Sequence, residues 1–311
     1  GAAGVGMVLG LVQYLLGGRH LGTAGRFTGT AEDRDRGRRL LLTSAVAGAG
    51  LVALLALLDR SGAFALTAEG VADAGGVIIA GIALLYFLYI FLFGGLNPTE
   101  SKRMGVIAVL FLFSALFWSG FEQAGSSLNL VAERLTDRSV FGWEMPASWL
   151  QSVNPLFIIS LAPVFAALWV WLSNRSREPS SPAKFSLGLI LLGLGFLVMV
   201  WATMLAAGGE QVSPMWLVVT YFLHTSGELC LSPVGLSTVT KLAPQRMVGQ
   251  MMGVWFMSIS LGNLMAGQVA GFFEQMPLPQ LFGAVTLTTV VAGVLLALFV
   301  RPIRRMMSGV H

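Results

Sequence analysis

Long apolar runs, separated by short charged segments, dominate this chain. A run of about 20 apolar residues predicts a membrane-spanning helix. Only 11% of the residues are charged, whereas a soluble domain carries roughly 25%. Residues 1–18 are apolar from the first position and resemble the end of a further span. Eight full spans follow at residues 40–58, 75–95, 104–132, 149–173, 185–207, 214–241, 247–273 and 280–300.

These runs predict an all-α polytopic membrane protein. A β-barrel would show segments of about ten residues with alternating polarity, and the chain has none. The loops alternate in charge: the segment 19–39 contains six arginines, and the next loop is acidic. Because Lys and Arg are retained on the cytoplasmic side, we expect the basic loops and the C-terminus to face the cytoplasm.

The apolar beginning could be mistaken for a signal peptide. It lacks a charged n-region and an A-x-A cleavage site, and it runs directly into the arginine-rich segment. We therefore expect the chain to start partway through a membrane protein.

The composition argues against several classes of function. Cys230 is the single cysteine, so an intrachain disulfide is excluded, and the three histidines have no ligand-like spacing. No metal or other cofactor is predicted. HTSGE (224–228) is not the H-E-x-x-H of a metalloprotease, and no P-loop or nucleophile-plus-base set occurs. We expect neither an enzyme nor a nucleic-acid-binding protein, since the net charge of +4 follows from the basic loops.

Small residues and prolines within the spans predict how the helices pack. GQMMG (249–253), GNLMA (262–266) and GQVAG (267–271) place small residues four apart, which allows close helix contact. Pro155, Pro163 and Pro233 lie within spans, where proline frees a backbone carbonyl and permits a bend.

Two carboxylates, Glu122 and Glu228, lie well inside predicted spans. A charge at the bilayer centre is costly, so an intramembrane acid indicates function by default. On a continuous helix Trp118, Glu122, Ser126 and Asn129 share one face.

Other polar or aromatic positions accompany these two acids. Glu228 and Ser232 form an i,i+4 pair before Pro233. Gln151 and Asn154 lie three apart, and the span 247–273 contains Trp255 and Asn263.

Structural explanations compete with the functional ones. Serines such as Ser126 and Ser232 can hydrogen-bond to their own helix, and amides such as Asn129 and Asn154 can bridge helices. A packed, neutral histidine is the better interpretation of His224 than a partner for Glu228. The two glutamates are harder to explain this way, because no basic residue in these spans is placed to neutralise them. A carboxylate in a low-dielectric cavity can exchange a proton near neutral pH, and a pair of them suits a substrate with a positive amine.

Four segments resemble the proton-coupled oligopeptide transporters of the major facilitator superfamily. They are FWSGFEQAGSSLNL, WLQSVNPLFIISLAPVFAALW, GELCLSPVGLSTVTKLAP and MMGVWFMSISLGNLMAG, in the family's order and spacing. The resemblance is close over residues 98–300. It implies the following division: 1–18, end of helix six; 19–39, cytoplasmic basic loop; 40–97, a helix pair inserted between two six-helix bundles; 98–303, helices seven to twelve; 304–311, cytoplasmic tail.

The resemblance also implies roles for individual residues. Glu122 matches the family's acid of helix seven, which takes part in proton coupling and gating. Glu228 matches the helix-ten acid that receives the peptide's amino terminus, and Asn154 matches the asparagine beside it. Positions that match the pocket lining are Ser232, Trp118, Phe121 and Trp255, and weaker candidates are Gln151, Asn129 and Ser126.

The implied function is symport of di- and tripeptides with protons, driven by the proton gradient, across the bacterial inner membrane. The implied partners are peptides, protons, the lipid bilayer and an N-terminal six-helix bundle of the same protein. The family's basic residues for the peptide carboxylate and its E-x-x-E-R motif belong to helix one and do not occur here. Two alternatives stay open: a transporter of another small solute, such as nitrate, on the same scaffold, and a non-transporting half-protein that acts as a partner module.

Overall fold

The computed structural model describes residues 2–17, isolated positions between 35 and 61, and residues 68–140 and 142–309. It divides into two compact units, Gly1–Thr67 and Ala68–His311. The first unit contains the helix α1 (Ala2–Gly17). The predicted loop 19–39 and span 40–58 lie outside the described residues except for isolated positions.

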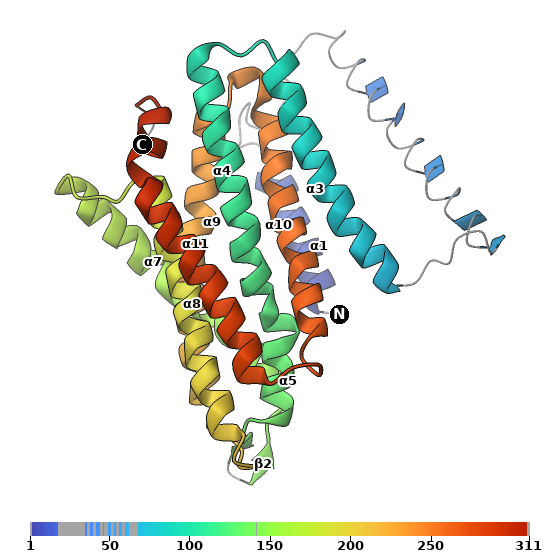
Figure 1. Cartoon of the computed structure of the whole chain (residues 1–311), viewed down its shortest axis with the longest axis vertical. Helices are drawn as coiled ribbons and strands as arrows, with labels where there is room; N and C mark the ends of the chain where they lie inside the picture. Colours follow the sequence, from blue (N-terminus) through green and yellow to red (C-terminus); the bar gives the residue numbers. More distant parts are fainter. Residues whose placement is uncertain are drawn as a thin grey trace. The chain divides into compact units, whose positions relative to one another are not determined.

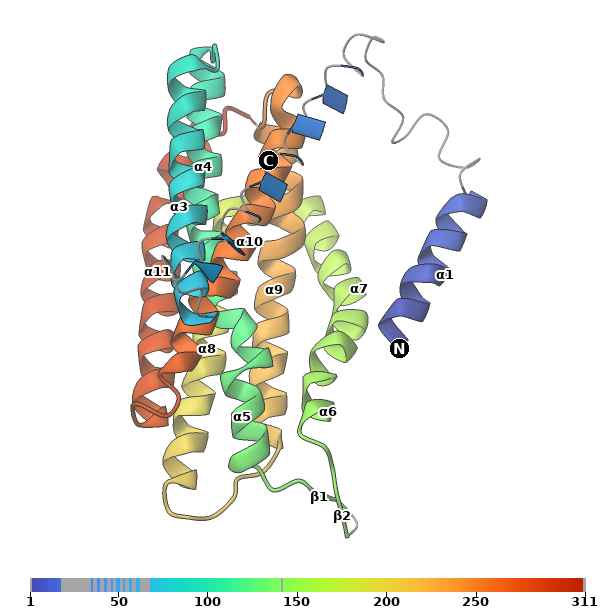
Figure 2. The same cartoon turned by 90° about the vertical axis from the view of Figure 1, so that its right-hand side faces the viewer.

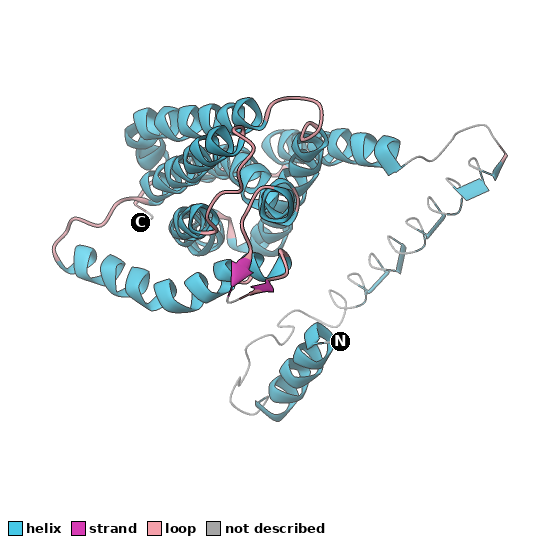
Figure 3. Cartoon of the chain, turned by 90° about the horizontal axis from the view of Figure 1, so that it is seen from below, coloured by secondary structure: helices cyan, strands magenta, loops and turns pink. Residues whose placement is uncertain are grey.

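The second unit is a bundle of long helices with one short hairpin (Figures 1 and 3). Every predicted span from residue 75 onward lies on helices of this unit. Its elements are α3 (Ala68–Phe93), α4 (Pro98–Phe121), η2 (Glu122–Gly125), α5 (Ser127–Arg134), β1 (Ser139–Val140), β2 (Trp143–Glu144), α6 (Ser148–Gln151), α7 (Val153–Asn174), α8 (Ser181–Ala206), α9 (Met215–Leu242), η3 (Gln245–Met247), α10 (Val248–Gly271) and α11 (Leu278–Met306).

Five helical segments among the described residues are long and apolar enough to cross a membrane. They are Ala74–Phe93, Pro98–Arg134, Ser148–Asn174, Ser181–Ala206 and Leu278–Met306. α9 and α10 have comparable lengths but are not among the five. Polar residues such as Glu228 and Asn263 interrupt their apolar sequence, which lowers the mean hydropathy of these two helices.

Helix α8 packs between α9 and α11, and its backbone approaches both closely. A Cβ added at Gly188 would lie 2.8 Å from the carbonyl oxygen of Gly227 on α9, so only glycine fits there. On the other side, the Ser186 hydroxyl donates a hydrogen bond of 2.8 Å to the carbonyl of Gly293 on α11. These contacts are the kind expected where small residues let transmembrane helices meet.

Helix α10 packs against α4 at a second close crossing. The Ser258 hydroxyl donates to that of Ser114 over 2.8 Å. One turn further along, a Cβ at Gly262 would lie 2.5 Å from the Cβ of Trp118. The small-residue prediction is therefore confirmed for GNLMA (262–266). No described atom lies within 4 Å of a Cβ added at the glycines of GQMMG and GQVAG, so for these two motifs close packing stays a prediction.

This contrast gives a stability test. Gly262→Ala forces α10 away from α4, and we expect it to lower the free energy of unfolding by about 1–3 kcal/mol. Gly267→Ala is the matched control on the same helix, because the space around its Cβ is open. Thermal unfolding of both purified variants in detergent measures their melting temperatures against that of the unmodified protein. Equal melting temperatures for the two variants would show that the α4–α10 contact is looser than described.

Candidate functional site

The predicted span 104–132 is interrupted at its most interesting position. α4 ends at Phe121, a single 3-10 turn covers Glu122–Gly125, and α5 begins at Ser127. Ser126 has φ −121° and ψ −96°, outside the helical region. The prediction of one continuous face for Glu122, Ser126 and Asn129 was therefore wrong. Breaks of this kind are typical of binding sites in the membrane, where a transporter helix is discontinuous.

The side chain of Gln123 holds the break in place. Gln123 is fully buried, and its amide donates to the carbonyl oxygens of Ala266 on α10, over 3.0 Å, and of Ser119, over 3.2 Å. Its side-chain oxygen accepts from the hydroxyls of Ser127 at 2.6 Å and Ser126 at 3.5 Å. Sequence reasoning missed Gln123, although its place beside an intramembrane acid was a usable signal.

Glu228 lies near the middle of α9 and is half-buried. Its Oε2 atom is buried and has no hydrogen-bond partner among the described residues. Such an atom is costly unless something pairs with it. None of the ion pairs within the described part of the chain involves Glu228 or Glu122. Glu228 is thus an acid without a basic partner in this unit.

Helix α7 brings the predicted asparagine to this acid. The amide of Asn154, in the first turn of α7, donates to the Thr225 hydroxyl over 2.9 Å, and the same side chain reaches the Glu228 carboxyl group. Figure 2 shows α7 running beside α9. Sequence reasoning found Asn154 and Glu228 but missed Thr225, which lies three residues before Glu228 on the same face of α9.

Pro155 follows Asn154, and the span is interrupted just before it, in line with its predicted role. It lies in the first turn of α7, after a separation from α6 at Ser152. Because proline has no N–H, Pro155 cannot bond to the carbonyl of Gln151, the last residue of α6, which is consistent with the break between the two helices. It starts the helix that presents Asn154.

The end of α4 meets the middle of α9, which brings the two acids together. The carboxyl groups of Glu122 and Glu228 are close enough for a direct Coulombic interaction. Phe121 and His224 lie 6.4 Å apart between ring centroids. His224 is 1% exposed and packs against Phe196 at 4.7 Å, so the prediction of a packed histidine is confirmed.

The three predicted aromatic residues have different surroundings. Phe121 is half-buried and forms an edge-to-face pair with Trp118 at 5.3 Å. Trp118 is buried, and its indole nitrogen has no partner among the described residues. Trp255 is 3% exposed, packs against Phe185 at 6.1 Å and covers Gly235. Phe121 therefore lies directly before Glu122 and is half-buried, whereas Trp118 and Trp255 are buried among the helices.

The remaining predicted residues border this region. Ser232 is half-buried one turn after Glu228, and Gln151 ends α6 and is half-buried. Asn129, on α5, has a buried side-chain oxygen without a partner among the described residues. The structure thus brings Glu122, Glu228 and Asn154 together, with Ser232 one turn from Glu228 on α9.

Comparison with known proteins identifies the family to which this helical chain belongs. A model of the POT family matches residues 1–286. The chain belongs to the POT family. It is 43% identical over 264 residues, 83% of its length, to "Peptide transporter YePEPT" of Yersinia enterocolitica, and covers 52% of that protein. It is 29% identical over 316 residues, 99% of its length, to the "Di-/tripeptide transporter" of Lactococcus lactis, and covers 63% of it.

Solved structures agree with this POT assignment. A "peptide transporter POT in complex with sulfate" superposes with a TM-score of 0.82 at 36% identity, over 99% of this chain and 62% of that one. A POT family transporter in complex with 5-aminolevulinic acid gives a TM-score of 0.80 at 28% identity, over 97% and 62%. The predicted major facilitator fold is confirmed. The chain spans between about half and two thirds of the length of these relatives.

Proposed function

We propose that this chain is part of a proton-coupled symporter that carries di- and tripeptides into the cytoplasm by alternating access. The observation that carries the proposal is the buried, unpartnered Glu228 oxygen beside Asn154. A buried acid in that state suits the positive charge that every free peptide carries at its amino terminus. The names of the relatives, a peptide transporter and a di-/tripeptide transporter, support the same substrate class.

Each residue of the site takes a role in the proposal. Glu228 receives the peptide amine, and Asn154, fixed by Thr225, orients it. Glu122 takes up the coupling proton at the α4–α5 break and biases a two-state equilibrium between outward-open and inward-open arrangements. Phe121 and Ser232 contact the peptide. The aromatic ring of Phe121 tolerates varied peptide side chains, as aromatic pocket walls do.

The other partners in the proposal lie outside the described unit. The N-terminal six-helix bundle supplies the opposite wall of the cavity, including the basic residues for the peptide carboxylate.

Within the described unit, Trp118 and Trp255 support the residues that line the pocket. Gln151, Asn129 and Ser126 line the margin of the pocket. The energy comes from the proton gradient, without any other cofactor.

We further propose the bacterial inner membrane as the location, with the C-terminus in the cytoplasm. The basic start of α4 and the basic segment at the end of α11 lie together at one end of the bundle: Arg103 donates to the carbonyls of Met307 and Ser308, over 3.3 and 3.1 Å. Gathering of positive charge at one end supports that orientation.

Uptake by the full-length protein in proteoliposomes tests the proposal. An inward proton gradient should drive accumulation of a labelled dipeptide, and a protonophore should abolish it. Accumulation of nitrate in place of the dipeptide would support the other-solute alternative. No uptake of either by protein that is folded and correctly inserted would support the partner-module alternative.

A further inference from the structure

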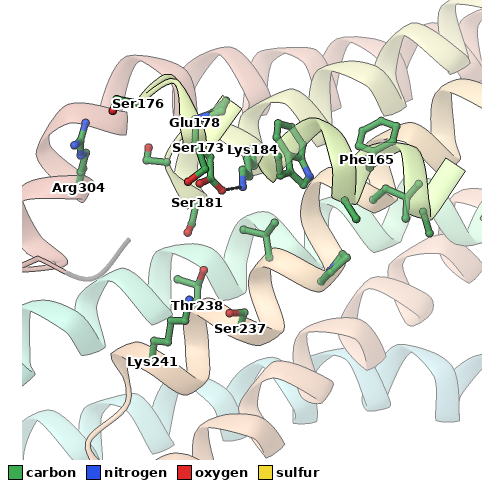
Figure 4. Close-up of a pocket in the computed structure, with 18 residues that line it drawn as sticks. Phe165, Ser173, Ser176, Glu178, Ser181, Lys184, Ser237, Thr238, Lys241 and Arg304 are labelled. Carbon is green, nitrogen blue, oxygen red and sulfur yellow. Dashed lines mark hydrogen bonds and ion pairs between the residues drawn. The ribbon is translucent and has the colours of Figure 1, made fainter. Parts of the chain in front are cut away.

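A cavity of about 670 Å³ lies between α7, α8 and α9, near the end of α11 (Figure 4). Its lining contains none of Glu122, Glu228 and Asn154. It opens on the side of α9 that carries Leu229, Pro233 and Ser237, so it is distinct from the candidate peptide site. The cavity has a polar end and an apolar end.

Lys184 forms the floor of the polar end. Its side chain is 8% exposed, and its ammonium group bonds to a Glu178 oxygen at 2.6 Å and lies 4.4 Å from the centroid of the Trp169 ring. This bond lowers the pKa of Glu178 below its ordinary value, so the pair stays ionised and internally neutral. Figure 4 shows the pair facing the cavity, with serine hydroxyls around it.

Two further cations give the polar end its net charge. Lys241, in the last turn of α9, and Arg304, near the end of α11, both line the cavity. Neither forms an ion pair with any described residue. Because Glu178 is already matched by Lys184, two positive charges remain uncompensated at the rim.

The other end of the cavity is apolar. Along α7 its lining changes from Phe165 through Trp169 to Ser173, a distance of about 12 Å along the helix axis. Leu229 and Val234 of α9 complete the apolar part. The most apolar stretch of the Ser148–Asn174 segment has none of its residues buried inside the unit, so α7 presents an apolar surface beside the cavity.

We propose that this cavity binds one anionic phospholipid. The phosphate group lies between Lys241 and Arg304, and an acyl chain extends past Phe165 toward the bilayer centre. The polarity gradient of the cavity follows that of one membrane leaflet, and basic pockets between helices at the cytoplasmic side suit acidic headgroups. A free phosphate would leave the apolar half wetted, and a zwitterionic lipid would leave the two cations unmatched. The proposal does not depend on peptide transport.

Lipid binding to the full-length protein tests this site. We expect the delipidated protein in detergent to bind phosphatidylglycerol more tightly than phosphatidylcholine with the same acyl chains, as measured by native mass spectrometry. The double variant Lys241→Gln/Arg304→Gln should weaken phosphatidylglycerol binding about tenfold or more, since each cation contributes to the attraction. The matched control is Lys102→Gln/Arg305→Gln, which removes the same charge from the same end of the bundle, outside the cavity lining, and should bind like the unmodified protein.

Two further arms separate the remaining interpretations. Excess inorganic phosphate should not displace the lipid, and displacement would mean that the site recognises free phosphate. A phosphatidylglycerol with a photoreactive acyl chain should crosslink near Phe165 on α7 in the unmodified protein, and Ala166→Trp should reduce that crosslink by filling the apolar end. Equal binding of both lipids, an unaffected double variant, or crosslinks only elsewhere would overturn the proposal.

Discussion

Glu228→Gln in the full-length protein is expected to weaken dipeptide binding by about 2 kcal/mol or more, roughly thirtyfold in Kd. The variant keeps the shape of the side chain and removes the charge that is proposed to meet the peptide amine. Glu228 has no basic partner among the described residues, so the substitution breaks no ion pair within this part of the protein. Isothermal titration with a dipeptide at neutral pH measures the effect.

The matched control for this experiment is Glu210→Gln. Glu210 is exposed in the turn between α8 and α9, so its substitution removes the same charge far from the Asn154–Thr225 contact. We expect the Kd of the Glu210→Gln variant for the dipeptide to equal that of the unmodified protein. Identical affinities for the Glu228 and Glu210 variants would remove Glu228 from the binding site.

Glu122→Gln is expected to abolish uphill accumulation of a labelled dipeptide and to leave counterflow measurable. Glutamine cannot carry the coupling proton, so the proton gradient can no longer drive accumulation of the peptide. Exchange of peptide across the membrane needs only binding and the conformational change. Proteoliposomes with and without a proton gradient separate the two activities.

Glu133→Gln serves as the control for the proton-coupling experiment. Glu133 lies on α5, beyond the helix break, and is exposed. Its substitution should leave accumulation and counterflow unchanged. Undiminished uphill uptake by the Glu122 variant, or loss of counterflow together with accumulation, would contradict its role as the coupling acid.

The positions of the helices were predictable because apolar runs report burial in lipid directly. The runs at 185–207 and 214–241 correspond closely to α8 and α9. The pairing of Asn154 with Glu228 was also predictable, although it came from the family resemblance: no spacing rule connects two residues on different helices.

The break at Glu122 was not predictable from helical periodicity. Assigning residues to a face assumes an unbroken helix, and the 3-10 turn depends on hydrogen bonds from Gln123 to α10. The glycine contacts show the same limit. Gly188 and Gly227 require each other across two helices, whereas the regularly spaced glycines of GQMMG have no close neighbour among the described residues. A motif within one helix does not indicate which face another helix covers.

The most direct test of the account is whether Glu228 recognises the peptide amine itself. Affinities of a free dipeptide and its N-acetylated form, measured on the unmodified protein and on Glu228→Gln, form a double-mutant cycle. The account predicts that acetylation weakens binding to the unmodified protein about tenfold or more and binding to the variant by less than about threefold. Equal losses on both proteins would show that this acid and the peptide amine do not meet.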